Sequence, residues 1–127
     1  MPVNIERTRQ YYDHLTEADL CSCAYCRNYI REIKTACPEL AAWLSNIAVD
    51  IEKPFEVIPI GPADGTMYYS GVQYVVLGTV DDFKETSVAG VQVFITDSHP
   101  MTDITEEHFV IETSSILLRW TDGQSGI

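Results

Sequence analysis

Basic residues are scarce in this chain, which has eight Lys and Arg against 19 Asp and Glu and a formal net charge of −11. Up to Lys34 the two signs balance, whereas from Thr35 onward three basic residues oppose fourteen acidic ones. Because an acidic body repels phosphate backbones, we expect no nucleic-acid binding. The charge favours a basic protein partner, although surplus carboxylates also serve solubility alone.

Long hydrophobic runs are also absent. Stretches such as 74–77 and 116–118 are far shorter than the roughly 18 apolar residues of a membrane-spanning helix. The first twelve residues contain no apolar stretch of the kind found in a secretory signal. We therefore expect a cytoplasmic protein that does not enter a membrane.

The composition is that of an ordinary globular chain, with 46% hydrophobic and 21% charged residues among 127. This length predicts one domain over residues 1–127 with a single core. Within it we expect a helical, Cys-rich part at 1–50, a β part at 54–120 and a frayed tail at 121–127.

Spacings of three and four predict one apolar helix stripe in the first part. Its members are Ile30, Ile33, Cys37, Leu40, Leu44 and Ile47. Pro38 interrupts the stripe, so the sequence allows either a kinked helix or a new helix that begins near Pro38.

Segments rich in β-branched and aromatic residues predict strands at 55–60, 67–69, 72–80, 91–96 and 109–120. Turn residues at 61–65, 81–82 and 98–100 separate them and favour antiparallel neighbours. The sequence therefore predicts an α+β fold, with N-terminal helices packed on one face of a four- or five-stranded, mainly antiparallel sheet in a meander. Asp103 and Glu106 form a possible capping box, which allows a short helix before the last strand.

Three cysteines within six residues are the strongest chemical signal. Cys21, Cys23 and Cys26 can converge on one soft metal ion, because a turn at a helix start directs their side chains inward. A complete zinc motif usually has a second pair of cysteines, which this segment lacks. We expect a structural zinc ion.

The fourth ligand has several candidates. Cys37 follows Cys26 by eleven residues, about 16 Å along a straight helix, so we expect it in the core instead. His14 is the preferred ligand and completes a Cys3His set. Asp19 is a second nearby donor, and His99 and His108 are long-range alternatives. A water molecule in this position would make the metal catalytic.

Two other interpretations of the cysteines stay open. Free reduced thiols are common in cytosolic proteins. A redox pair of Cys23 and Cys26 would gain from a helix N-terminus and from Arg27, although no strand precedes it as in thioredoxin-type motifs. Arg27, Arg31 and Lys34 also form a basic helix edge, which can bind an anion but is more often a solvated face.

The chain over residues 11–55, above all DLCSCAYCRNY at 19–29 and DIEKPF at 50–55, resembles a group of small uncharacterised bacterial proteins. The resemblance implies a bacterial cytoplasmic origin and carries no functional residue over.

Two functions follow as hypotheses. The first is a non-enzymatic, zinc-stabilised interaction module with an acidic surface for a basic protein partner, in which neutralising Asp81, Asp82 and Glu85 weakens association. The second is an enzyme, either a small zinc hydrolase or a thiol-redox enzyme that uses Cys23 and Cys26.

Overall fold

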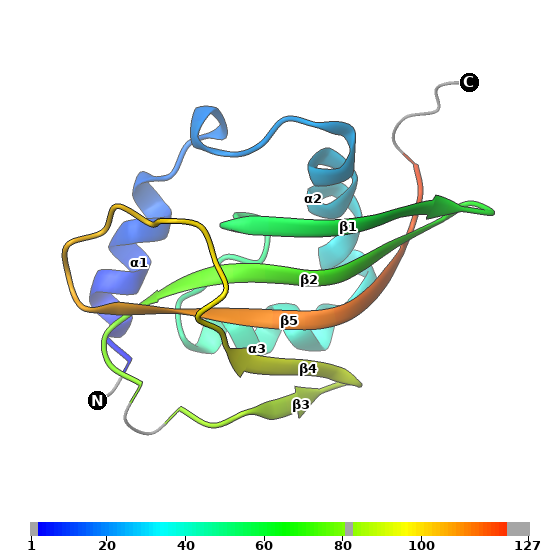
Figure 1. Ribbon diagram of the computed structural model, residues 1–127. Coiled ribbons are helices and arrows are strands. Elements are labelled where there is room, and N and C mark those ends of the chain that lie inside the picture. The colour runs from blue at the N-terminus through cyan, green and yellow to red at the C-terminus, as the bar shows by residue number, and fades with distance from the viewer. Residues whose placement is uncertain (1–2, 81–82, 122–127) are drawn as a thin grey trace.

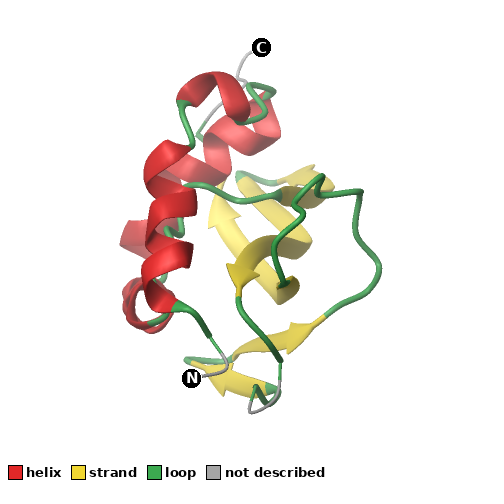
Figure 2. Cartoon of the chain, turned by 90° about the vertical axis from the view of Figure 1, so that its left-hand side faces the viewer, coloured by secondary structure: helices red, strands yellow, loops and turns green. Residues whose placement is uncertain are grey.

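The computed structural model describes residues 3–80 and 83–121, and it has two main layers. Three helices, α1 (Ile5–His14), α2 (Ala24–Ala36) and α3 (Pro38–Asn46), cover one face of a five-stranded antiparallel sheet (Figures 1 and 2). This confirms the predicted α+β fold with its helices on one side of the sheet. No helix in the described part of the chain is long and apolar enough to cross a membrane.

The helical stripe is confirmed, and Pro38 marks the start of a new helix. Cys37 separates α2 from α3, and Pro38 occupies the first position of α3, where its missing amide hydrogen costs nothing. Ile33, Leu40 and Leu44 from the stripe are fully buried against the sheet.

The first hairpin joins β1 (Glu56–Ala63) to β2 (Thr66–Leu77) through Asp64 and Gly65. Both turn residues have positive φ, 54° and 79°, as a type I′ hairpin requires. The turn expected at 61–65 is therefore only two residues long. The strands expected at 67–69 and 72–80 are one continuous strand, β2.

The predicted meander is wrong, because the strand order is β1-β2-β5-β4-β3. The second hairpin consists of β3 (Thr86–Val88) and β4 (Val91–Ile95), and β5 (His108–Arg119) inserts between β2 and β4. The reason is length: β5 pairs with β2 from Thr66↔Arg119 to Leu77↔His108, which buries far more surface than a pairing with short β4 alone.

Residues 96–107 connect β4 to β5 and cross the sheet face opposite the helices (Figure 1). The short helix that a capping box allowed here does not form. Asp103 has a φ of 60°, in the left-handed region, whereas an N-cap residue needs an extended backbone.

The main core lies between the helices and the sheet and includes the fully buried Tyr29, Tyr69 and Tyr74. A smaller cluster of Val75, Leu77 and Val110 lies on the other face, where Phe55 and Ile104 pack against it. The predicted turn residues Asp81 and Asp82 lie outside the described residues, as does the predicted tail beyond residue 121. Thr121 itself is held by a 2.8 Å hydrogen bond from its backbone N–H to Asn28 Oδ1.

Candidate metal centre

The cysteine segment, residues 15–23 between α1 and α2, is shaped by the N-termini of two successive helical elements. A single 3₁₀ turn, η1 (Glu17–Asp19), begins with a capping box in which Asp19 Oδ2 accepts the Thr16 backbone N–H at 2.8 Å. Cys23 is then the N-cap of α2, and its carbonyl accepts the Arg27 backbone N–H at 2.9 Å. The Arg27 guanidinium also donates to the Ser22 carbonyl. These bonds fold residues 20–23 back over the first turn of α2.

The result is a cluster of three thiols. The sulfur atoms of Cys21, Cys23 and Cys26 all lie within 4.8 Å of one another. Cys21 and Cys23 are exposed, whereas Cys26 faces the interior and is 9% exposed. The structure thus brings together the three cysteines that the sequence singled out, in an arrangement that can hold a metal ion.

The thiols differ in acidity. Burial raises the pKa of Cys26, and its hydrogen bonds with Cys21 and Cys23 and the charge of these neighbours raise it further. Burial also acts to raise the pKa of Cys23, but hydrogen bonds from the Cys26 backbone and from the thiols of Cys21 and Cys26 outweigh it, so this pKa is lowered. A cation bound among the sulfurs would favour the thiolate form of all three.

The three thiols line a cavity of about 150 Å³ between the cysteine segment and the start of β1. Its other walls are mainly apolar and include Ile30, Phe55 and Val57. Two carboxylates, those of Asp19 and Glu56, also line it. Neither carboxylate belongs to the group of ligand atoms that lie within 4.8 Å of one another, so a metal ion would need one of them to move toward the sulfurs.

His14 lies elsewhere. Its Nδ1 is 2.7 Å from the Gln10 carbonyl oxygen at the end of α1, and its side chain lines a different cavity, together with Ile104 and Glu106. The group of ligand atoms within 4.8 Å of one another contains the three sulfurs and not His14.

The other histidines are also engaged in local contacts. The His99 ring packs edge-on against Phe55, with ring centroids 6.3 Å apart. His108 Nε2 is 2.8 Å from Thr102 Oγ1, and its Nδ1 is 2.8 Å from the Glu106 carbonyl oxygen. Neither belongs to the thiol cluster.

Cys37 packs against the main core, as expected from the stripe. It is half-buried at the junction of α2 and α3, and burial raises the pKa of its thiol.

The three basic residues on the edge of α2 line two different cavities. Arg27 and Arg31 line a cavity beside Cys21, whereas Lys34 lines a separate cavity with Arg9. Arg31 Nε donates to Thr121 Oγ1 at 3.2 Å. The three cations therefore do not converge on one anion.

Sequence reasoning missed Glu56 as a donor near the thiols and missed the cavity that Lys34 shares with Arg9. The available signal for Glu56 was its position directly after Pro54 and Phe55, where the helical part meets the first strand.

No family model, no curated protein and no solved structure matches this chain.

Proposed function

We propose that the protein binds one zinc ion through Cys21, Cys23 and Cys26, and that the bound ion has a structural role in a non-enzymatic interaction module. The observation that supports this is the mutual approach of the three sulfurs to within 4.8 Å. Around a tetrahedral zinc ion with Zn–S bonds of about 2.3 Å, two sulfurs lie about 3.8 Å apart. Ligand binding thus needs side-chain shifts of only about 1 Å.

The structural role follows from what the ion would connect. The cysteine segment between α1 and α2 contains only one 3₁₀ turn, and its cavity is closed on the other side by the start of β1. An ion held by two exposed thiolates and the buried Cys26 would fix this segment to the first turn of α2. The α2 N-terminus and Arg27 would offset part of the thiolate charge.

The fourth ligand distinguishes two versions of the site. His14 stays the sequence-based prediction. To reach the ion, however, its side chain would have to change rotamer and break its contact with the Gln10 carbonyl oxygen. Asp19 lines the cavity of the thiols, and because its Oδ2 accepts hydrogen bonds from the Thr16 backbone and hydroxyl, Oδ1 is the oxygen that would bind the ion. The shared cavity favours Asp19, so we expect Asp19→Asn to weaken zinc binding more than His14→Ala does.

Metal analysis of untagged protein prepared without chelator tests the proposal. We expect about one zinc per chain and protection of three thiols from a thiol reagent. Cys23→Ser should remove the metal, whereas Cys37→Ser is the matched control and should keep it. Protein without metal in which all four thiols react rapidly would refute the proposal.

The partner is proposed to be a basic protein that meets the sheet side of the molecule. The 96–107 segment crosses the sheet face that the helices leave uncovered, and its exposed residues include Asp97, Asp103 and Glu107. This segment contains no Lys or Arg. Charge of one sign on one face accelerates the encounter with an oppositely charged surface, and salt screens it.

A pull-down across a salt series tests the acidic face. We expect the retained basic protein to be lost as salt rises and to be lost in the triple variant Asp97→Asn, Asp103→Asn and Glu107→Gln. The control neutralises three carboxylates on the helical side, Glu6, Glu17 and Glu39, and should retain the partner. Retention that ignores salt and the first variant would mean that the charge serves solubility alone.

A thiol-redox function is the second candidate, because exposed Cys23 lies at a helix N-terminus beside buried Cys26. In this reaction the Cys23 thiolate attacks a protein disulfide and releases one substrate thiol. The Cys26 thiolate then attacks the Cys23 sulfur, which releases the second substrate thiol and forms a Cys23–Cys26 disulfide that an external thiol reduces again. Disulfide reductase activity that Cys23→Ser abolishes, in metal-free protein, would favour this candidate over the structural one.

A further inference from the structure

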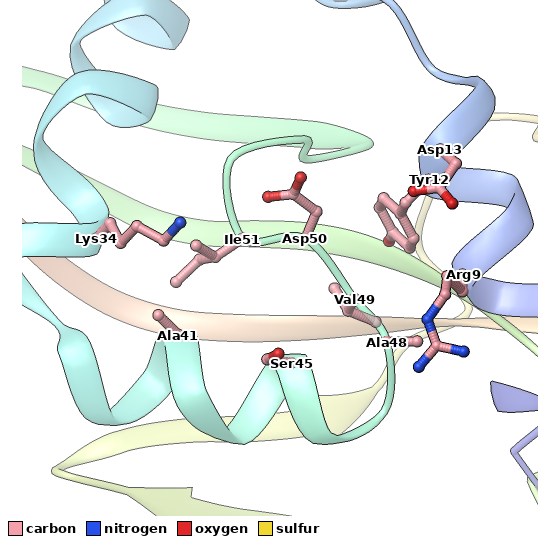
Figure 3. Close-up of a pocket in the computed structure, with 10 residues that line it drawn as sticks. All are labelled: Arg9, Tyr12, Asp13, Lys34, Ala41, Ser45, Ala48, Val49, Asp50 and Ile51. Carbon is pink, nitrogen blue, oxygen red and sulfur yellow. The ribbon is translucent and has the colours of Figure 1, made fainter.

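A second cavity, with a volume of about 310 Å³, lies where the three helices meet the chain segment that follows α3. Figure 3 shows Arg9 and Asp13 on the α1 side and Lys34 on the α2 side. The Asp50 carboxylate lies between them, on the opposite side of the opening from Ser45 of α3. The cavity is distinct from that of the thiol cluster.

Small side chains create this space. Ala41 and Ser45 are one turn apart on α3 and leave the region above them open, and buried Tyr12, Val49 and Ile51 line its inner wall. The volume is at the lower end of the range of about 300–1,000 Å³ that is typical of ligand pockets. A small metabolite fits such a site better than a large cofactor.

The walls of the cavity are held in place before any ligand arrives. The Tyr12 hydroxyl donates to the Val75 carbonyl at 2.7 Å, and Lys53 Nζ donates to the Tyr12 carbonyl at 2.7 Å. Asp50 Oδ1 accepts the Glu52 backbone N–H at 3.0 Å, which orients its carboxylate. The inner wall and Asp50 therefore need little ordering on binding, whereas the exposed side chains of Lys34 and Arg9 become ordered by the ligand.

Opposite charges line this cavity without neutralising one another. The charged lining residues are Arg9, Asp13, Lys34 and Asp50. Among the residues that the structure describes, one of them forms an ion pair: Arg9 pairs with Glu6 at 3.6 Å, and Glu6 is not part of the cavity lining. Lys34 has no hydrogen-bond partner within residues 3–80 and 83–121, whereas Lys53 has two. The cavity thus presents two cations and two carboxylates to whatever enters it.

We propose that this cavity binds a free α-amino acid as its zwitterion. A ligand with one sign of charge would meet as much repulsion as attraction from walls of both signs. Lys34 and Asp50 point into the same part of the cavity (Figure 3), where they match a carboxylate and an ammonium carried on one carbon. The ligand side chain then extends over Ser45 toward Arg9.

Binding of each of the twenty common L-amino acids to the full chain tests this proposal, with thermal shift as a screen and calorimetry for affinity. We expect at least one to bind, and its N-acetyl and carboxamide derivatives to bind at least about tenfold more weakly, because each lacks one charge. Lys34→Gln and Asp50→Asn should each weaken binding by a similar factor. Ser45→Leu should block it by filling the cavity.

Three controls make the outcome decisive. Lys84→Gln removes a cation elsewhere and should bind like the wild type. Cys23→Ser should also bind normally, which separates this site from chelation of a thiol-bound metal. Circular dichroism checks that each variant is folded. The proposal is overturned if no amino acid binds, if the capped derivatives bind equally well, or if the Lys34 and Asp50 variants keep wild-type affinity.

Discussion

Asn28→Ala should destabilise the fold strongly, because Asn28 connects α2 to the end of β5 although it is a polar residue with no exposed surface. Its Nδ2 donates to the Arg119 carbonyl at 2.9 Å, and its Oδ1 accepts the Thr121 backbone N–H at 2.8 Å. Two longer bonds, of 3.3 and 3.2 Å, join it to the hydroxyls of Tyr69 and Thr121. Alanine at this position leaves buried donors and acceptors without partners.

The magnitude follows from these bonds. A net loss of about 1 kcal/mol for each of the two short bonds, and about 1 kcal/mol more for stranded polar groups and the small void, gives about 3 kcal/mol. For a chain of this length the entropy of unfolding converts about 1 kcal/mol into about 4 °C, so the melting temperature should fall by about 12 °C.

Urea unfolding of Asn28→Ala measures the loss directly. The midpoint should fall while the slope of free energy against urea stays unchanged, because the surface exposed on unfolding is the same. Asn46→Ala, at the exposed end of α3, is the matched control and should change stability by less than about 0.5 kcal/mol. A loss below about 1 kcal/mol for Asn28→Ala would refute the argument that these bonds hold α2 to β5.

Three further predictions concern the backbone and one ion pair. Gly71→Ala places a Cβ 2.5 Å from Glu112 Oε2, the movable end of a side chain, so by urea unfolding it should cost only about 1 kcal/mol, the worth of the Gln73–Glu112 hydrogen bond that the shift disturbs. Ala48→Gly should stabilise by about 1 kcal/mol in the same assay, because Ala48 has a φ of 64° at the end of α3. The Arg7 hydrogen bond lowers the pKa of Glu106 in the folded protein. The stability that this pair contributes is therefore present above the pKa that Glu106 has in the unfolded chain, and it is lost as the pH falls through the pKa of Glu106 in the folded protein. Thermal melts from pH 6 to pH 3 should therefore show a shallower decline for Glu106→Gln.

Features encoded over short distances in the chain could be predicted from the sequence. The stripe from Ile30 to Ile47 needs only helix periodicity, and the α2–α3 boundary needs only the chemistry of Pro38. The approach of Cys21, Cys23 and Cys26 is local in the same sense, because one turn and one helix start bring them together.

Features that depend on long-range pairing could not be predicted. The insertion of β5 between β2 and β4 is decided by the total surface that each pairing buries. The alternating residue patterns of the strands are similar, so they do not reveal which strands pair. Asp50 and Lys34 line one cavity because α3 turns the chain back, which their separation in sequence does not reveal. The same holds for Glu56 beside the thiols.

The position of the thiol cluster also determines what loss of a metal ion should do. The main core does not include the three cysteines and is built by residues such as Ile33 of α2, Leu40 of α3 and Tyr74 of β2, all fully buried. Because this core does not depend on the cysteines, metal removal should not unfold the domain as it unfolds a zinc finger. Chelation should instead raise hydrogen exchange at residues 15–26 and leave exchange in β2 and β5 unchanged. Global unfolding of the chelated protein would mean that the ion stabilises the whole fold and that the local role argued for it is wrong.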